Sequence, residues 1–299
     1  MVELCVGVLG ASSLVGECLL PMLRDAGWRV VAYTRQKARQ AGGGISWRQL
    51  PKVANASTGS ARTAAESGEG VTPYWICVAP IWVLPEYFPL IEASGARRVV
   101  ALSSTSRFTK VGSGDTAENA VAARLIEAEG RFVAWAKSRG IECVILRPTL
   151  IYGLGQDKNI SEIARFIRRF SFFPVFGRAQ GLRQPIHAED VAAACFSALQ
   201  ATNAANRAYN ISGGETLTYR AMVARIFAAL GRRPCLLAVP LWAFRLAVSV
   251  LRCLPRYRHW SAAMAERMNQ DLVFDHSEAA RDFGFKPRTF SISPEDIAR

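Results

Sequence analysis

The sequence predicts an α/β fold in which a doubly wound parallel sheet is followed by a smaller C-terminal lobe. Short apolar runs alternate with helical patterns through the first half of the chain, as expected for right-handed crossovers between parallel strands. A glycine turn joins the first apolar run to the first helical pattern. The 299 residues are sufficient for one large α/β unit and an appended lobe. We place the boundary between residues 153 and 154.

The opening residues predict a strand, a turn and a helix. Leu4–Leu9 is a short, mostly apolar run, long enough for one buried parallel strand. The turn Gly10–Gly16 follows, and apolar residues at helical spacing then continue to Gly27, which ends the helix. Pro21 removes one hydrogen bond from the helix at a cost of about 3 kcal/mol, so we expect a kink there.

This turn is expected to bind a nucleotide cofactor. Such a unit places backbone N–H groups and the N-terminus of a helix around one point, where they bind a pyrophosphate. The alternative is a strand-turn-helix unit without a ligand. The residues predicted to contact the cofactor here are Gly10, Ser12, Ser13, Leu14, Val15 and Gly16.

The charges after the second strand favour NADP over NAD. That strand is predicted within residues 28–35 and ends on Arg35, with Lys37 and Arg39 close behind, and residues 26–65 contain no Asp or Glu. A carboxylate at this place usually holds the ribose 2′-hydroxyl of NAD, whereas an arginine accommodates the 2′-phosphate of NADP. We therefore expect Arg35 to select NADP. The alternative is a solvated charge at the end of a loop.

The remaining elements of the sheet follow the same alternation. Residues 40–73 are rich in Gly, Ala, Ser and Thr and predict a loop with a short strand or helix inside it, so the third strand is not assigned to residues. The sequence then predicts strands at Tyr74–Val78, Arg98–Leu102 and Glu142–Leu146, a proline-interrupted helical stretch within Trp82–Ala93, and helices at Ala117–Arg139 and Ile160–Phe170.

Several later segments resemble one enzyme family. Gly10–Gly16 is similar to the Gly-x-x-Gly-x-x-Gly loop of the extended short-chain dehydrogenases, the NAD(P)-dependent epimerase/dehydratase family, with Ser13 in place of the middle glycine. The resemblance covers nearly the whole chain. The other matching segments, in the family's order, are Tyr74–Pro80, Val99–Thr105, Cys143–Gly153, Gln184–Val191, Tyr209–Gly214 and Phe274–Pro287.

The resemblance implies how the site is divided along the chain. It implies a Rossmann-like dinucleotide-binding domain over residues 1–153 and a mixed substrate-binding lobe over residues 154–299, with segments that return to the sheet. Further cofactor contacts are implied at Ala79, Pro80, Ser103 and Pro148. Substrate contacts are implied at Thr105, Tyr152 and Arg183.

The chain departs from the family at its proton-transfer residues. A Tyr-x-x-x-Lys pair normally supplies a tyrosinate that acts as acid or base. Counted back from Arg147, these positions fall near Val121 and Leu125, and residues 88–151 contain no tyrosine. Because neither valine nor leucine carries a proton, the usual mechanism is not open to this chain.

Ser104 is the catalytic candidate that remains. It aligns with the family's serine or threonine that contacts the substrate hydroxyl, but a serine cannot replace tyrosine as an acid near neutral pH. Lys110, on the loop after the same strand, would serve as a substitute acid if it were desolvated. The alternative is an exposed loop lysine. Asp115 and Glu118 allow the same two interpretations.

Arginines in the second half are candidates for binding a diphosphate, because a planar guanidinium pairs bidentately with phosphate oxygens. Arg183 is the first choice, since the matching region in sugar-nucleotide enzymes often contacts the diphosphate. The alternative is a solvated basic face. His187 is expected to be a structural histidine. The arginines of this group are Arg165, Arg168, Arg169, Arg178 and Arg183.

The net charge of +13 and the pI of 9.9 indicate an anionic partner. No nucleic acid is expected, because no nucleic-acid motif occurs. Residues 236–254 are strongly apolar but interrupted by Arg245 and Arg252, so the run is too short to span a bilayer, which needs about 20 residues. A helix lying on a membrane surface and a core or homodimer helix fit this segment equally well.

The seven cysteines show no paired metal spacing, so no metal is expected, and most lie in apolar runs, which indicates a reducing compartment. The N-terminus lacks the pattern of a signal peptide. We therefore expect a cytoplasmic protein, with membrane association as an open alternative.

Two functions remain. The first is an NADP-dependent reductase, epimerase or dehydratase that acts on a nucleotide-linked sugar or a lipid-like substrate, with Ser104 holding the reacting oxygen. The second is a noncatalytic NAD(P)-binding structural or regulatory protein, resembling an accessory subunit of respiratory complex I. The substrate-side segments between Arg147 and Lys286 favour the first, and the missing Tyr-x-x-x-Lys pair favours the second.

Overall fold

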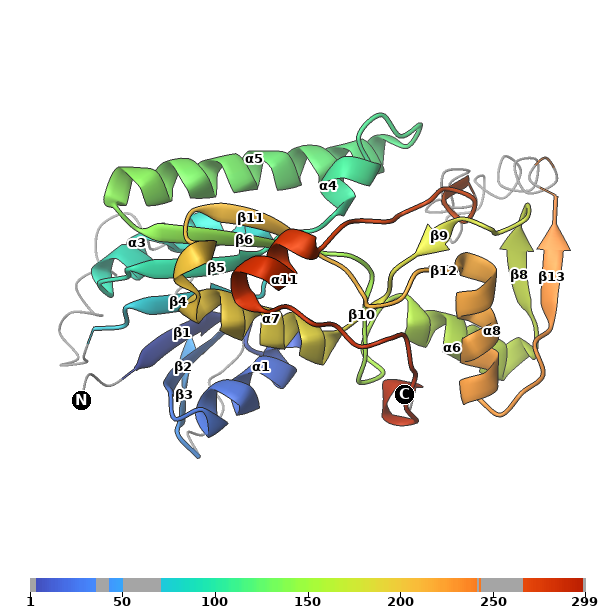
Figure 1. Cartoon of the computed structure of the whole chain (residues 1–299), viewed down its shortest axis with the longest axis horizontal. Helices are drawn as coiled ribbons and strands as arrows, with labels where there is room; N and C mark the ends of the chain where they lie inside the picture. Colours follow the sequence, from blue (N-terminus) through green and yellow to red (C-terminus); the bar gives the residue numbers. More distant parts are fainter. Residues whose placement is uncertain (1–3, 36–42, 51–70, 241, 243–265, 298–299) are drawn as a thin grey trace.

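The computed structural model describes residues 4–35, 43–50, 71–240, 242 and 266–297. Lys37, Arg39 and most of the predicted apolar segment, residues 243–254, lie outside the described residues. Figure 1 shows a sheet with helices on both faces and, beside it, a smaller lobe that contains α6 (Ile160–Phe170) and α8 (Tyr219–Ala229).

Seven strands form the main sheet, and every neighbouring pair in it is parallel. They are β1 (Cys5–Leu9), β2 (Arg29–Thr34), β3 (Ile45–Gln49), β4 (Tyr74–Cys77), β5 (Arg98–Leu102), β6 (Glu142–Pro148) and β11 (Arg207–Ile211). Their spatial order is β11-β6-β5-β4-β1-β2-β3 (Figure 1). From β1 the strands are added in one direction, to β2 and β3, whereas β4, β5 and β6 are added in the other direction, so the strand order switches between β1 and β4. Open α/β sheets bind ligands at such a switch point, outside the C-terminal ends of the strands. The predicted doubly wound parallel sheet is confirmed.

Both faces of the sheet are covered by helices, as the alternating strand side chains require. Val6 and Val8 belong to the core under α1 (Leu14–Asp25) and α7 (Ala188–Gln200). Cys5 and Leu9 point to the other face. That face is covered by η2 (Ile81–Tyr87), α3 (Phe88–Ala93) and α5 (Thr116–Arg139), and α5 is reached from β5 through the short α4 (Ser106–Thr109).

Val121 and Leu125, near which the family resemblance implies the Tyr-x-x-x-Lys pair, lie on the inner face of α5. Leu125 is buried in the core between α5 and the sheet, and Val121 packs against that core. Their apolar side chains therefore contribute packing between α5 and the sheet.

The smaller lobe has a core of its own, built mainly between α6 and α8. Three two-stranded ladders surround it: β7 (Ile151–Tyr152) with β10 (Ile186–His187), β9 (Leu182–Arg183) with β12 (Leu217–Thr218), and β8 (Phe173–Phe176) with β13 (Leu236–Val239). β11 and α7 return to the main sheet, and α11 (Ser277–Phe283) packs beside them with η3 (Thr202–Ala204). The last described element is η5 (Glu295–Ile297). The boundary at residues 153 and 154 stays a prediction.

Within the described part of the chain, no helix combines the length and the apolar character needed to cross a membrane. The same residues contain no group of His, Cys, Asp and Glu side chains placed to hold a metal ion.

Candidate functional site

The turn after β1 is held tight by two glycines. Gly10 has φ 80°, and a Cβ at this position would lie 2.5 Å from the backbone nitrogen of Ala79. A Cβ on Gly16 would lie 2.5 Å from the carbonyl oxygen of Ala11. Any side chain would therefore push the turn away from β4 or from the start of α1, and the space for a nucleotide would be lost.

Ser13 caps the helix that follows the turn. Its Oγ accepts a hydrogen bond of 3.2 Å from the backbone N–H of Gly16, and its own N–H donates to the carbonyl oxygen of Gly10 at 2.9 Å. A serine is a favoured N-cap residue, so Ser13 stabilises the turn where the family has a glycine. Leu14 and Val15 form the first turn of α1, whose positive end favours a bound phosphate.

A cavity of about 330 Å³, which we call the nucleotide cavity, lies beside this turn. It combines residues of the turn with the ends of β2 and β4 and with η2, all of which meet at the C-terminal edge of the sheet. Among its described lining residues, none carries a carboxylate. The predicted cofactor residues that line it are Gly10, Ser12, Ser13, Arg35, Ala79 and Pro80, and further walls come from Tyr33, Thr34, Leu50, Trp82 and Tyr87.

One arginine, Arg35, lines this cavity, and a second, Arg48, contacts the lining residue Tyr33. Arg35 is exposed at its rim. Burial raises the pKa of Tyr87, and the charge of Arg35 acts against this rise. Arg48, on β3, is the register partner of Tyr33, whose pKa is raised by burial and lowered by the charge and hydrogen bond of Arg48. The sequence did not single out Arg48, because the third strand that places it there was not assigned.

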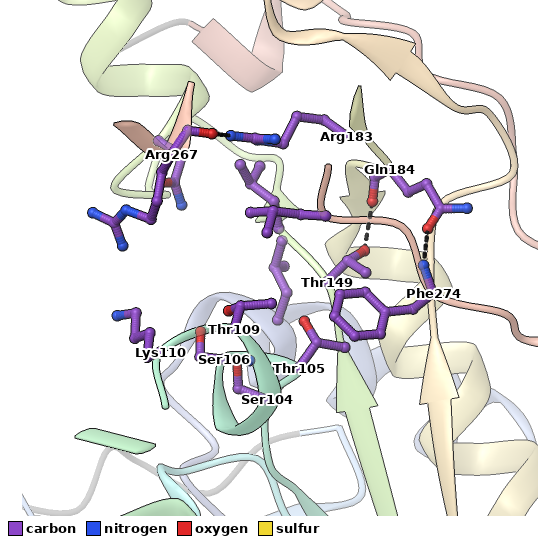
Figure 2. Close-up of a pocket in the computed structure, with 14 residues that line it drawn as sticks. Ser104, Thr105, Ser106, Thr109, Lys110, Thr149, Arg183, Gln184, Arg267 and Phe274 are labelled. Carbon is purple, nitrogen blue, oxygen red and sulfur yellow. Dashed lines mark hydrogen bonds between the residues drawn. The ribbon is translucent and has the colours of Figure 1, made fainter. Parts of the chain in front are cut away.

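A second cavity, of about 410 Å³, lies at the C-terminal ends of β5 and β6 (Figure 2). One side is formed by the connection from β5 to α5, and the other by segments of the smaller lobe. Its titratable described lining residues are Lys110, Arg183 and Arg267, and none of the others is Tyr, His, Asp or Glu. The rest of the lining is Ser104, Thr105, Ser106, Thr109, Thr149, Leu150, Ile151, Asn159, Gln184, Leu272 and Phe274.

Ser104 and Thr105 occupy this cavity as predicted, but their hydroxyls have different partners. The Ser104 Oγ accepts a hydrogen bond of 3.1 Å from the N–H of Ser106 at the start of α4. The Thr105 hydroxyl donates to the carbonyl oxygen of Pro148 at 3.1 Å, and Thr105 is buried. Thr105 therefore joins the end of β5 to the end of β6, while Ser104 lines the cavity on a half-buried turn.

Arg183 is buried in the wall of the cavity, where its guanidinium donates to the carbonyl oxygens of Leu182 and Gln270, each at 2.7 Å, and of Arg267. These bonds fix its direction. The Arg267 guanidinium is held by Glu118 on α5, with a nitrogen–oxygen distance of 2.6 Å. Arg267 comes from a segment far away in the sequence, so no local pattern could indicate its place in the site.

The five arginines predicted as a diphosphate site are not brought together. Only Arg183 lines the cavity. Arg165 pairs with Glu162 on its own helix at 2.8 Å, and Arg168 donates to the carbonyl oxygen of Ile297. A helix distributes its side chains around its axis, so arginines close in sequence do not share one site.

Ser103 and Pro148 lie outside the described lining of the nucleotide cavity. The Ser103 hydroxyl donates to Glu129 Oε1 at 2.5 Å, which turns it towards α5. Glu129, only 4% exposed, also binds Arg107 and, at 2.7 Å, Arg147. Glutamate in the middle of a long helix is usually solvated, so no local pattern indicates this buried ion cluster.

Tyr152 lies outside the described linings of both cavities. It is fully buried, its hydroxyl donates to the carbonyl oxygen of Ser291 at 2.9 Å, and its ring packs between His187 and Phe290. His187 has the structural role expected for it: its Nδ1 accepts from the N–H of Glu189, and its Nε2 lies 3.1 Å from Asp296 Oδ1.

The remaining acid and base candidates, Asp115, Glu118 and Lys110, lie at or close to the start of α5. Asp115 caps the N-terminus of α5 through the N–H of Ala117, and Glu118 is buried against Arg267. Lys110 is half-buried beside them. Burial lowers the pKa of Lys110 and the charge of Arg267 lowers it further, whereas Glu118 and Asp115 act in the opposite direction.

Part of this chain is similar to one known protein family. Residues 88–212 match the family model described as the NAD dependent epimerase/dehydratase family. The UDP-glucose 4-epimerase of Vibrio cholerae is 26% identical over 161 residues, or 54% of this chain and 47% of that protein. The mitochondrial NADH dehydrogenase [ubiquinone] 1 alpha subcomplex subunit 9 of Dictyostelium discoideum is 27% identical over 77 residues, or 26% of this chain and 21% of that protein. The matched part thus spans half or less of these curated relatives.

Solved structures share the fold over almost the whole chain. The UDP-glucose 4-epimerase of Thermotoga maritima, with UDP-glucose, has a TM-score of 0.68 at 14% identity and covers 98% of this chain and 95% of its own. MoeE5 in complex with UDP-glucose and NAD has a TM-score of 0.66 at 22% identity, with 98% and 96% covered.

Proposed function

Because residues 88–212 match the model of the NAD dependent epimerase/dehydratase family, we propose that this chain binds NADP at the Gly10 turn and uses it on an anionic, nucleotide-linked substrate held near Ser104. One observation carries the proposal: the second cavity places Ser104 opposite buried and half-buried cations, at the same edge of the sheet as the glycine turn.

The nucleotide cavity fits a dinucleotide phosphate. The turn leaves no room for a Cβ at Gly10 or Gly16, and the N-terminus of α1 faces the space that this creates. Arg35, on the cavity rim, and Arg48, held beside the lining residue Tyr33, would supply charge for a 2′-phosphate, and no described lining residue would repel it. When bound, the nicotinamide ring supplies or accepts a hydride. The preference for NADP over NAD rests on these two arginines.

The second cavity fits an anionic substrate. Arg183 is fixed by three backbone carbonyls and Arg267 by Glu118, so both guanidiniums are oriented before a ligand arrives. Lys110 adds a third positive charge. Because the Thermotoga epimerase and MoeE5 are described with UDP-glucose, a diphosphate-linked sugar is the substrate class that we propose first, and a lipid-linked one second.

Ser104 would orient the reacting oxygen. Its hydroxyl accepts from the Ser106 N–H, and that bond leaves the hydroxyl hydrogen to point towards a substrate carbonyl or hydroxyl. Serine does not supply a proton at neutral pH, so Ser104 binds and orients while another group must move the proton.

Two measurements test this function. Titration of the purified protein with NADPH and NADH should give tighter binding of NADPH, and tighter binding of NADH would remove the role of the two arginines. Incubation with deuterium-labelled NADPH and a panel of UDP-sugars and their keto forms should transfer label to at least one substrate. A complete absence of transfer would contradict an enzymatic function.

The second candidate, a noncatalytic nucleotide-binding protein, is supported by one structural observation. Leu125 lies in the core and Val121 packs against it, at the positions near which the family resemblance implies Tyr and Lys. The short match to the complex I subunit of Dictyostelium discoideum agrees with this alternative. Nucleotide that stays bound through purification, together with no transfer of label, would favour it.

A further inference from the structure

We propose that Lys110 is the proton donor for the reaction at Ser104 and so takes the place of the family's missing tyrosine. This inference rests on the proposed function. It concerns a side chain that reaches the substrate cavity from a different segment than the family's pair, namely the turn after α4.

The backbone places Lys110 and Ser104 on one cavity wall. The single turn of α4 follows Ser104, and Lys110 caps it, with its N–H donating to the carbonyl oxygen of Ser106 at 3.1 Å. Both side chains line the second cavity. Figure 2 shows Lys110 on the side of α4 that faces Arg267, with Ser104, Ser106 and Thr109 on the adjacent turn. A substrate oxygen bound at Ser104 would therefore share its cavity with the Lys110 ammonium.

The composition of the cavity excludes the other described lining residues as donors. Arginine does not release its proton in proteins, which removes Arg183 and Arg267. The hydroxyls of serine and threonine are too weakly acidic near neutral pH. Lys110 is the one described lining side chain that can both give a proton and regain it from water.

Burial, followed by the charge of Arg267, favours release of the Lys110 proton. Arg267 lies on the same side of the cavity as Lys110 in Figure 2. Glu118 and Asp115, at the start of α5, also act on Lys110. Arg267 and Glu118 are paired at 2.6 Å, and of the three charges Arg267 has the largest single effect on Lys110. Together with burial, this arrangement lowers the pKa of Lys110, which brings the ammonium closer to the acidity that a general acid needs.

In the reduction of a substrate carbonyl, the carbonyl carbon would receive a hydride from NADPH held at the Gly10 turn, and the cofactor would leave as NADP⁺. As the C=O π bond breaks, its electron pair moves to the oxygen, which takes one proton from the Lys110 Nζ; an N–H bond breaks and an O–H bond forms. The neutral amine then regains a proton from water. In the reverse direction, the neutral Lys110 amine accepts the proton from the substrate hydroxyl.

The test compares three variants in the full-length protein. Lys110→Met removes the proton and the charge, Lys110→Arg keeps the charge but cannot release a proton, and Lys137→Met is the control, because Lys137 is exposed in the last turn of α5. Label transfer from deuterated NADPH to the best UDP-sugar or keto-sugar substrate is measured as a function of pH, alongside NADPH binding.

We expect Lys110→Met and Lys110→Arg each to lower kcat/KM by about 100-fold or more, while Lys137→Met changes it by less than about twofold. NADPH binding should stay unchanged in all three. The wild-type rate of reduction should fall as pH rises through the pKa of Lys110, and this limb should be missing in Lys110→Met.

Near-normal activity of Lys110→Arg would show that Lys110 contributes only charge, and near-normal activity of Lys110→Met would show that it contributes neither. Either result overturns this proposal and leaves the proposed function standing. No transfer by the wild type overturns both. An independent readout is competitive acetylation of the apo-protein, in which Lys110 should react with a pKa below the 10.5 of an ordinary lysine; an ordinary value would contradict the proposal.

Discussion

Replacing Glu129 with glutamine tests whether the buried ion cluster behind the site stabilises the fold. The Glu129 carboxylate is 4% exposed and binds Ser103, Arg107 and Arg147. Glu129→Gln keeps the size of the side chain but leaves two guanidiniums without a counter-charge.

The size of the effect follows from how deeply these groups are buried. Removing one partner of a buried ion pair costs about 3 to 5 kcal/mol. The side chains of Arg107 and Arg147 are 22% and 16% exposed, so water reaches them and the cost falls at the lower end of that range. We expect Glu129→Gln to lower the free energy of unfolding by about 3 kcal/mol.

The assay is urea unfolding followed by circular dichroism, with Glu127→Gln as the matched control. Glu127 is on the same helix and pairs with Arg131 at 3.9 Å, but its side chain is 70% exposed. An exposed pair contributes about 0.5 kcal/mol or less, so the control should unfold almost like the wild type. If the two variants unfold within about 1 kcal/mol of each other, the reasoning from burial is refuted.

Three further predictions concern the nucleotide cavity and the C-terminal segment. Gly10→Ala should abolish NADPH binding, because its Cβ would meet the backbone of Ala79. Gly112→Ala is the control: Gly112 has a similar φ of 74°, but a Cβ there would have no atom within 4 Å, so this variant should only lower stability. Calorimetric titration of both variants with NADPH checks this. Arg35→Ala and Arg48→Met should each weaken NADPH binding by about tenfold, or about 1.4 kcal/mol, and leave NADH binding unchanged in a parallel titration; equal losses for both nucleotides would contradict a 2′-phosphate contact. Burial tends to raise the pKa of Asp296, but hydrogen bonds from His187 and Ser293 outweigh it and lower the pKa to about 2, from 3.8. Its ionised form should therefore contribute about 2 kcal/mol above pH 4, which is lost as pH falls towards 2; Asp296→Asn should remove that part of the pH dependence of unfolding, and an unchanged acid limb would count against it.

Local patterns predicted most of the fold. β5 and α6 have the predicted bounds, and α5 begins one residue before its predicted start, because strong apolar periodicity and clear end signals define them. β3 was not assigned, since Ile45 and Trp47 alternate with polar residues after a run of glycines and the strand lies at the edge of the sheet.

The site was predictable where it depends on one continuous segment. The glycine turn brings its own residues together, so Gly10, Ser12 and Ser13 line the cavity as expected. Arg267 reaches the second cavity only through the tertiary fold, and no spacing in the sequence indicates it. Tyr152 belongs to a family motif, but a motif does not say on which side of a short strand its hydroxyl points.

The two cavities have no described residue in common. The described lining of the nucleotide cavity lies within residues 9–87, and that of the second cavity within residues 104–274. Substitutions in one segment can therefore accumulate while the other is kept by selection. In a chain of this architecture, the residue that transfers the proton can be lost or moved to another position while the cofactor-binding segment is kept. Cofactor binding and proton transfer can therefore evolve separately.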